Sequence, residues 1–168
     1  FMKGLAKTAR AEDPSRLTAA ACLINHTDLV IEDRLAAYID VIGINEYYGW
    51  YESAFSDLKA VLANSHPDRP VIISETGADG DHSFGPKTGL FSLEYQANYY
   101  RRQIKILRDV DYVRGMTPWI LYDFRVERRQ GVYQRGFNRK GLIAADKTTK
   151  KPAFGVLASY YAERRHNR

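Results

Sequence analysis

RPVIISETGADG, from Arg69 to Gly80, is the stretch on which the fold prediction rests. The run from Val71 to Ser74 is apolar on both faces, as in a parallel strand buried between a barrel interior and a shell of helices. The run ends on Glu75, and Thr76-Gly77 then turns the chain. Because strand side chains alternate, one face, expected to point into a barrel, carries Val71, Ile73 and Glu75, and the other carries Ile72, Ser74 and Thr76.

Glu75 is therefore expected at the carboxyl end of a buried strand, where parallel α/β folds carry their chemistry. A carboxylate that pairs with an arginine at a strand end is the alternative interpretation, and this stretch alone does not separate the two.

The rest of the chain alternates between strand and helix patterns. Strands are expected over residues 17–24, 41–45, 71–75 and 116–123, and helices over residues 1–12, 29–38, 54–62, 93–108 and 152–165. Ser92 is expected to cap the fourth helix, and polar loops are expected over residues 79–91 and 124–140. This alternation predicts a parallel sheet with helical crossovers. An eight-stranded barrel needs about 250 residues, so residues 1–168 are predicted to form one partial domain, about half of a barrel.

Composition restricts the classes of function. Cys22 is the only cysteine, which excludes an internal disulfide and a cysteine-based metal site. No signal peptide and no membrane-spanning run is recognisable, and no compartment follows from the sequence. The net charge is +5, with basic clusters at Arg125-Arg128-Arg129 and Arg164-Arg165-Arg168. A solvated basic surface is preferred over nucleic-acid binding. We therefore expect neither a nucleic-acid nor a membrane partner, and neither a metal nor a cofactor.

Four segments then appear in a recognisable order: DVIGINEYYGWY (40–51), PVIISETGADG (70–80), PWILYDF (118–124) and NRKGL (138–142). With these motifs the chain resembles the carboxyl-terminal half of the catalytic barrel of family 2 glycoside hydrolases, the family of β-glucuronidases and β-galactosidases. The resemblance implies strands five to eight of a (β/α)8 TIM barrel. It also implies a retaining β-glycosidase that hydrolyses terminal β-galactosides or β-glucuronides, with a carbohydrate substrate.

The resemblance assigns the catalytic nucleophile to Glu75, with Asn45, Tyr47 and Tyr51 lining the pocket beside it. Such a nucleophile works with a second carboxyl about 5–5.5 Å away. Tyr47 is expected to donate a hydrogen bond to the Glu75 carboxylate, although packing of the aromatic run is the alternative, preferred for Tyr48 and Trp50. Glu46 is expected to point away from the pocket, as a structural ion-pair partner.

Three more substrate-binding residues follow from the resemblance. Trp119 is expected at the pocket floor, with a core tryptophan as the alternative, and Asn138 with Lys140 is expected to hold a substrate carboxylate, as in glucuronidases. Gln134 stands where glucuronidases often carry an arginine, and similar NxKG segments occur in other family 2 enzymes, so the sugar stays open between galactoside and glucuronide.

The acid/base glutamate of the family is expected upstream of Phe1, outside residues 1–168. Two open strand edges and a bare inner face, carrying Val71 and Ile73, are expected to prevent the isolated chain from being a stable monomer. The same features are expected to make it associate with the missing amino-terminal half of the barrel or with itself as a homo-oligomer. The isolated chain is expected to be inactive because Glu75 lacks the acid that protonates the leaving group. A carbohydrate-binding or scaffold fragment without activity is the alternative function.

Overall fold

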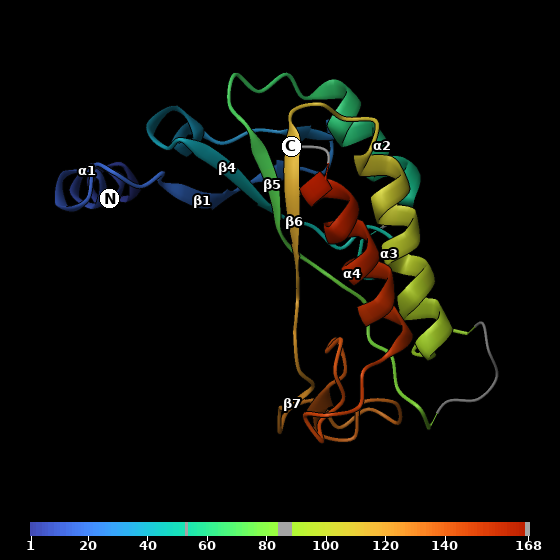
Figure 1. Cartoon of the computed structure of the whole chain (residues 1–168). Coiled ribbons are helices and arrows are strands. Elements are labelled where there is room, and N and C mark those ends of the chain that lie inside the picture. The colour runs from blue at the N-terminus through green and yellow to red at the C-terminus, as the bar shows by residue number, and fades with distance from the viewer. Residues whose placement is uncertain (53, 84–88, 167–168) are drawn as a thin grey trace. The chain divides into compact units, whose positions relative to one another are not determined.

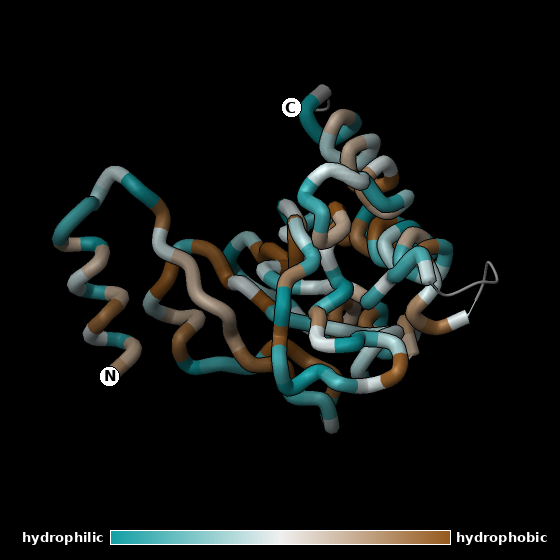
Figure 2. The backbone as a smooth tube through the Cα atoms, turned by 90° about the horizontal axis from the view of Figure 1, so that it is seen from below, coloured by the Kyte–Doolittle hydropathy of each residue, from teal (hydrophilic) through white to brown (hydrophobic). Residues whose placement is uncertain are grey.

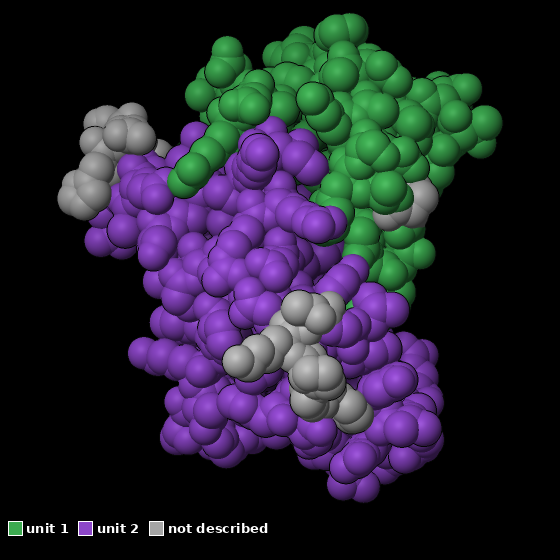
Figure 3. All heavy atoms as spheres, turned by 90° about the vertical axis from the view of Figure 1, so that its right-hand side faces the viewer, with its two compact units in different colours: residues 1–76, 108–117 green, residues 77–107, 118–168 purple. Residues whose placement is uncertain are grey.

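The computed structural model describes residues 1–52, 54–83 and 89–166, and Figure 1 shows its elements. The chain divides into two compact units, which Figure 3 colours separately. Unit 1 comprises residues 1–76 and 108–117, and unit 2 comprises residues 77–107 and 118–168. Within the predicted loop at 79–91, residues 84–88 lie outside the described part of the chain.

Unit 1 is built on a four-stranded sheet in the order β1 (Ala19–Cys22), β4 (Val41–Asn45), β5 (Val71–Thr76) and β6 (Val113–Pro118). The β1–β4 and β4–β5 pairs are parallel. Parallel neighbours need crossover connections, and α2 (Phe55–Asn64) supplies the one between β4 and β5. The predicted α/β class and the order of strands are therefore confirmed.

Helix α1 (Met2–Glu12) precedes β1, as the sequence predicted. Hydrophilic and hydrophobic residues are mixed along it, as Figure 2 shows beside the amino terminus. None of its residues is buried in the described structure. Its apolar side chains therefore contribute little stability through burial in this chain.

The segment after β1 departs from the prediction. The expected strand over residues 17–24 is shorter, and the start of the expected helix at 29–38 is instead a strand. A small antiparallel hairpin, β2 (Ile24–Asn25) with β3 (Val30–Ile31), comes first, and the 3-10 helix η1 (Arg34–Tyr38) follows. The Asn25 side-chain oxygen accepts hydrogen bonds from the backbone N–H groups of Thr27 and Asp28, at 3.0 and 3.1 Å. This local turn competes with the helix.

The two faces of β5 are not those that strict alternation predicts. Val71 and Ile73 are fully buried, and they pair in register with the buried Ile42 and Ile44 of β4. The expectation that they form a bare inner face, shared with Glu75, is therefore wrong.

A β-bulge at Ser74 is the cause. The register runs from Ile44 opposite Ile73 directly to Asn45 opposite Glu75, so Ser74 is the extra residue. Glu75 consequently lies on the face of Asn45, opposite to the face of Val71 and Ile73. The Thr117 hydroxyl of β6 donates to the Ser74 carbonyl at 2.6 Å, which satisfies a backbone group at the bulge.

Gly43 of β4 accommodates the bulge from the other side. A Cβ atom at this position would lie 2.8 Å from the Ser74 hydroxyl and 2.9 Å from the Ala20 carbonyl oxygen. Only a residue without a side chain lets the bulged strand approach this closely.

Unit 2 contains two packed helices, α3 (Leu93–Leu107) and α4 (Pro152–His166), both close to their predicted bounds. The Ser92 hydroxyl accepts a hydrogen bond from the Tyr95 N–H at 3.1 Å, so the predicted cap of α3 is confirmed. Buried apolar side chains on these helices include Ala97, Tyr100, Ile104, Ala153, Leu157 and Tyr160.

The expected strand over residues 116–123 is wrong in its second half. β6 ends at Pro118, and the apolar residues after it pair with the segment that follows Lys140 instead of extending the sheet. Ile143 donates its N–H to the Leu121 carbonyl at 2.9 Å and accepts from the Asp123 N–H at 3.0 Å.

The predicted polar loop at 124–140 is also partly ordered. It contains the antiparallel pair β7 (Phe124–Arg125) and β8 (Phe137–Asn138).

Candidate active site

Two neutral donors hold the Glu75 carboxylate at the end of β5. The Tyr47 hydroxyl donates to Oε1 at 2.5 Å, and the Asn45 side-chain amide donates to Oε2 at 3.3 Å. Each carboxylate oxygen thus has its own donor, which fixes the plane of the group. Glu75 remains half-buried, so the carboxylate is oriented but accessible.

The strand ends explain this geometry. Asn45 is the last residue of β4, and its side-chain oxygen accepts from the Ser74 hydroxyl at 2.8 Å, so its amide nitrogen faces Glu75. The bulge therefore supplies both the position of Glu75 and the group that orients Asn45. This role of Ser74 was not predicted from the sequence.

The aromatic run after β4 divides into an accessible part and a buried part. Tyr47 is half-buried, and its ring centroid lies 5.1 Å from that of Tyr51, which is 57% exposed. Tyr48 is buried, and its hydroxyl forms a 2.8 Å hydrogen bond with His26 Nδ1. Burial, with the nearby carboxylates Glu52 and Glu46, raises the pKa of Tyr48 to about 12. Tyr48 is therefore a packing residue, as expected, whereas Tyr47 bonds to Glu75 and contacts the exposed ring of Tyr51. The pocket-lining role of Tyr51 stays a prediction.

Glu46 lies next to Asn45 in the sequence, but its side chain is buried whereas that of Asn45 is exposed. Its side chain is fully buried and accepts the Tyr48 N–H at 3.0 Å, while its own N–H donates to the Glu75 carbonyl at 2.9 Å. This arrangement agrees with the expectation that its side chain points away from the Glu75 carboxylate. Its role as an ion-pair partner stays a prediction.

Unit 2 brings Asn138 and Lys140 together. Both are buried, and the Asn138 side-chain oxygen accepts the Lys140 N–H at 3.0 Å. The Lys140 ammonium lies 3.2 Å from Asp79, which is fully buried. Asp79 also accepts from the Arg139 N–H at 2.9 Å and from Gln134 Nε2 at 3.1 Å. Lys140 thus has a carboxylate partner inside the protein.

Sequence reasoning missed Asp79. The available signal was an acidic residue four positions after Glu75, in a stretch whose neighbours are small. A carboxylate with no solvent exposure needs cations and N–H donors around it, and the segment from Gln134 to Lys140 supplies them.

Trp119 lies in unit 2, just after β6. It is half-buried, and its ring meets Phe124 edge to face at 6.3 Å. A Cβ atom at Gly77 would collide with the Trp119 carbonyl oxygen, and the Tyr100 hydroxyl is close to the same point. The glycine that follows Glu75-Thr76 is therefore required by the close approach of the Trp119 backbone.

A second buried ion pair lies in the same unit. The Lys151 ammonium is 2.7 Å from Asp123 and also donates to the carbonyls of Gly80 and Arg139. Burial raises the pKa of Asp123 and lowers that of Lys151, and the attraction between the two opposes both shifts. The Lys151 ammonium thus connects residues from three segments that are distant in the sequence: Gly80, Asp123 and Arg139.

The site residues therefore form two groups. Asn45, Tyr47, Tyr51 and Glu75 belong to unit 1, whereas Trp119, Asn138 and Lys140 belong to unit 2. Among the described residues, no cluster of His, Cys, Asp and Glu has the arrangement of a metal site. A search of the described helices finds none whose length and apolar character would let it cross a membrane.

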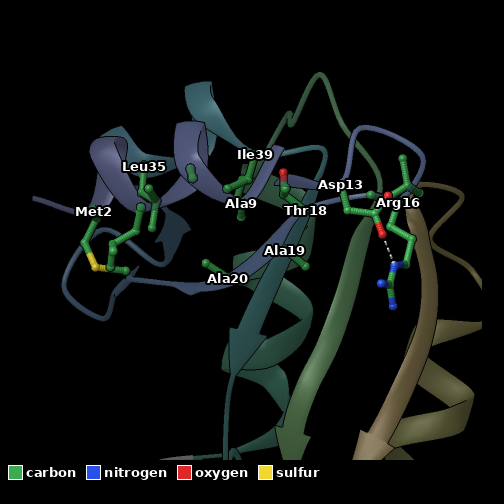
Figure 4. Close-up of a pocket in the computed structure, with 12 residues that line it drawn as sticks. Met2, Ala9, Asp13, Arg16, Thr18, Ala19, Ala20, Leu35 and Ile39 are labelled. Carbon is green, nitrogen blue, oxygen red and sulfur yellow. Dashed lines mark hydrogen bonds and ion pairs between the residues drawn. The ribbon is translucent and has the colours of Figure 1, made fainter. Parts of the chain in front are cut away.

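An apolar pocket of about 410 Å³ lies elsewhere in unit 1, between α1, η1 and β1 (Figure 4). Met2, Ala9, Leu35 and Ile39 line it, and the Asp13–Arg16 ion pair, at 2.6 Å, lies on its wall. None of the predicted site residues lines this pocket, so it is separate from the Glu75 group.

The sequence of this chain matches a known protein family over almost its whole length. The model of the family described as glycosyl hydrolases family 2, TIM barrel domain, matches residues 1–164, and the chain belongs to that family. A beta-glucuronidase of Paenibacillus borealis is 30% identical over 174 residues, which cover 97% of this chain and 28% of the relative. This chain therefore spans little more than a quarter of the length of that relative.

Two solved structures extend the likeness to three dimensions. The FMN-binding beta-glucuronidase from Facaelibacterium prausnitzii L2-6 has a TM-score of 0.81 and 30% identity, covering 96% of this chain and 26% of that one. Bacteroides uniformis beta-glucuronidase 2, covalently bound to cyclophellitol-6-carboxylate aziridine, has a TM-score of 0.69 and 33% identity, covering 88% and 18%. The predicted family and TIM-barrel fold class are thus confirmed.

Proposed function

We propose that this chain supplies the nucleophile side of a retaining β-glycosidase, with Glu75 as the nucleophile. The observation that carries the proposal is the Glu75 carboxylate, held at a strand end by the Tyr47 hydroxyl at 2.5 Å and the Asn45 amide at 3.3 Å. Neutral donors orient the group without supplying a cation that would neutralise it. An accessible, oriented carboxylate is what attack on an anomeric carbon requires.

The reaction proceeds in two displacements. A Glu75 oxygen bonds to the anomeric carbon as the bond to the aglycone oxygen breaks, and a second carboxyl gives that oxygen a proton. Water then attacks the glycosyl-enzyme, loses a proton to the second carboxyl, and frees Glu75. We propose that this second carboxyl is supplied from outside residues 1–168, by a longer enzyme of which the chain is a part.

A β-glucuronide is the favoured substrate, ahead of a β-galactoside. Both relatives at 30% identity described above carry the name beta-glucuronidase, and the inhibitor named with the third bears a 6-carboxylate. Asn138 and Lys140 are the groups proposed to meet the sugar carboxylate. Because Lys140 is already 3.2 Å from Asp79, its ammonium would be shared between the protein carboxylate and the substrate.

Covalent labelling tests the proposal. The full-length enzyme is incubated with cyclophellitol-6-carboxylate aziridine, and the modified peptide is identified by mass spectrometry. We expect one adduct, on Glu75, that is lost in Glu75→Gln and retained in Glu46→Gln. An adduct on a different carboxylate, or labelling of Glu75→Gln at the normal rate, contradicts the assignment.

Residues 1–168 alone provide a second arm of the test. Without a second carboxyl, this chain is expected to bind a glucuronide without hydrolysing an aryl β-glucuronide. Turnover by the isolated chain would show that a carboxyl within these residues acts as the acid, with Glu46 the first candidate. Failure of the full-length enzyme to hydrolyse any glycoside would favour the non-catalytic carbohydrate-binding alternative.

A further inference from the structure

Residues 124–140 form a basic hairpin, which contains β7 and β8 of unit 2. It carries six basic side chains and one acidic one, Glu127. The hairpin alone thus has a net charge of +5, as large as that of the whole chain. The basic side chains are Arg125, Arg128, Arg129, Arg135, Arg139 and Lys140.

The cations nearest the site are already matched by carboxylates. Lys140 lies 3.2 Å from Asp79, and Arg139 lies 2.6 Å from Asp81. Arg125 and Arg128 differ, because both are exposed and neither forms an ion pair with any described residue. Their charges are therefore available to a ligand.

The backbone of the basic hairpin is well braced. Val126 donates its N–H to the Gly136 carbonyl at 2.8 Å, and Gly136 donates back to the Arg129 carbonyl at 2.7 Å. Tyr133 stacks on Phe91 with ring centroids 4.6 Å apart. Arg125 and Arg128 thus project from an ordered element, which lowers the entropy lost when a ligand binds.

We infer that the basic hairpin binds an acidic oligosaccharide, a chain in which uronate carboxylates recur from sugar to sugar. The inference rests on the proposed function and extends it from a single terminal sugar to a polymeric substrate. Strand β8 ends at Asn138 and leads directly to Arg139 and Lys140, so one continuous segment connects the terminal-sugar residues with Arg125 and Arg128. Guanidinium groups pair with carboxylates through two parallel hydrogen bonds.

Continuity with Asn138 and Lys140 favours an acidic saccharide over a nucleic acid. Non-specific binding of single-stranded nucleic acid uses aromatic faces on which bases stack. The aromatic ring in the centre of the hairpin, Tyr133, is stacked on Phe91 instead. Exposed Val132 offers a small apolar surface on the same hairpin, against which the face of a sugar ring can pack.

A binding measurement tests the inference without any need for turnover. A hyaluronan octasaccharide, which alternates glucuronate with a neutral sugar, is titrated by calorimetry at low salt into the full-length enzyme carrying Glu75→Gln. The same octasaccharide with its carboxylates converted to methyl esters is the matched ligand control. We expect binding to the acid, at least about tenfold weaker binding to the ester, and weakening with added salt.

Two charge reversals locate the surface. Arg125→Glu and Arg128→Glu together are expected to weaken binding at least about tenfold, because two ion pairs with the ligand are lost and each reversed charge repels its carboxylates. Arg165→Glu, an exposed arginine of α4 with the same change in charge, is the matched protein control and should weaken binding less than about twofold. Circular dichroism verifies that all variants fold.

Three results would overturn the inference: equal affinity for acid and ester, equal effects of the hairpin and α4 variants, or absence of binding. A short DNA duplex that binds as tightly as hyaluronan, with the same sensitivity to the hairpin variants, would assign the surface to nucleic acid. The outcome is separable from that of the proposed function, because labelling of Glu75 is expected to be unchanged in the Arg125→Glu, Arg128→Glu variant, which keeps Asn138 and Lys140.

Discussion

Glu75 and Asp79 are four residues apart in the sequence, but they are held in opposite ways. Glu75 is half-buried and bonded by two neutral donors, a phenol and an amide. Asp79 has no solvent exposure and is surrounded by the Lys140 ammonium, the Arg139 N–H and the Gln134 amide. The difference separates a carboxylate arranged to react from one arranged to stabilise.

The contrast follows from the energetics of buried charge. A carboxylate without water requires a cation nearby, because an uncompensated charge in the interior costs several kcal/mol. A cation at such short distance also lowers the nucleophilicity of the group, so a reacting carboxylate is better served by neutral donors and partial exposure. Substitutions of these two carboxylates and their partners, measured as changes in the free energy of unfolding, test whether the two are held in different ways.

Asp79→Ala should have the largest effect. It leaves the Lys140 ammonium buried without its partner, and removing one member of a buried pair costs about 3–5 kcal/mol. Urea unfolding measures the loss, and Asp111→Ala, at an exposed position, is the matched control. Similar small losses for both variants would mean that Asp79 is not the structural carboxylate described above.

Lys151→Met should follow, with an effect that depends on pH. The variant leaves Asp123 buried without its cation, at a cost of about 3 kcal/mol near pH 8. Burial raises the pKa of Asp123 in the folded state. A raised carboxyl pKa stabilises the fold at low pH, and this stabilisation is lost as pH rises through the folded pKa.

Loss of the Lys151 cation raises the pKa of Asp123 further, so Asp123 in the variant takes up a proton more readily. The stability difference between Lys151→Met and the unmodified protein should therefore be smaller near pH 5 than near pH 8. Urea unfolding at the two pH values measures it. A difference independent of pH would show that Asp123 does not change its protonation in this range.

Tyr47→Phe should cost about 1.5 kcal/mol, the lower end for a hydrogen bond to a charged group, because the Glu75 carboxylate retains access to water. Tyr122→Phe is the control, since the ring is partly exposed and its hydroxyl has no hydrogen bond to any described residue. Urea unfolding compares the two. If Tyr47→Phe lowered the free energy of unfolding by several kcal/mol, Glu75 would be a structural carboxylate like Asp79.

Glu75→Gln should have the smallest effect on stability, less than about 1 kcal/mol, because the amide oxygen can still accept from Tyr47 and the side chain keeps its volume. Thermal unfolding compares this variant with Asp79→Asn, the same chemical change four residues later. Equal destabilisation by the two amides would remove the distinction on which the assignment of Glu75 depends.

Much of the fold could be predicted because its elements follow hydrophobic period and capping. The bounds of β4 were predicted correctly, and those of α2, α3 and α4 to within two residues. The failures came from pairing. Residues 119–123 have the composition of a strand, but they bond to residues 142–143 and leave the sheet. Local sequence does not show with which other segment an apolar run will form backbone hydrogen bonds.

The candidate site was predictable only in part. The resemblance led to Asn45, Tyr47 and Glu75, and the structure places their side chains in one hydrogen-bonded group. The reasoning about faces was nevertheless wrong, because the bulge at Ser74 has no signature in the sequence. Asp79 was missed because its burial depends on residues about sixty positions later, and such distant pairings cannot be seen in one sequence. The substrate-binding roles of Trp119, Asn138 and Lys140 and the homo-oligomer stay predictions.

The bulge at Ser74 also has a consequence for how such a strand tolerates change. Before the bulge, Val71 and Ile73 face the interior of the protein. The extra residue in the bulge then places the Glu75 carboxylate on the opposite face of β5. Deleting one residue there would leave the composition of the strand almost unchanged and yet turn Glu75 inward. A strand of this kind is therefore intolerant of length variation, and its length at this point is what a designer of a new carboxylate site should preserve.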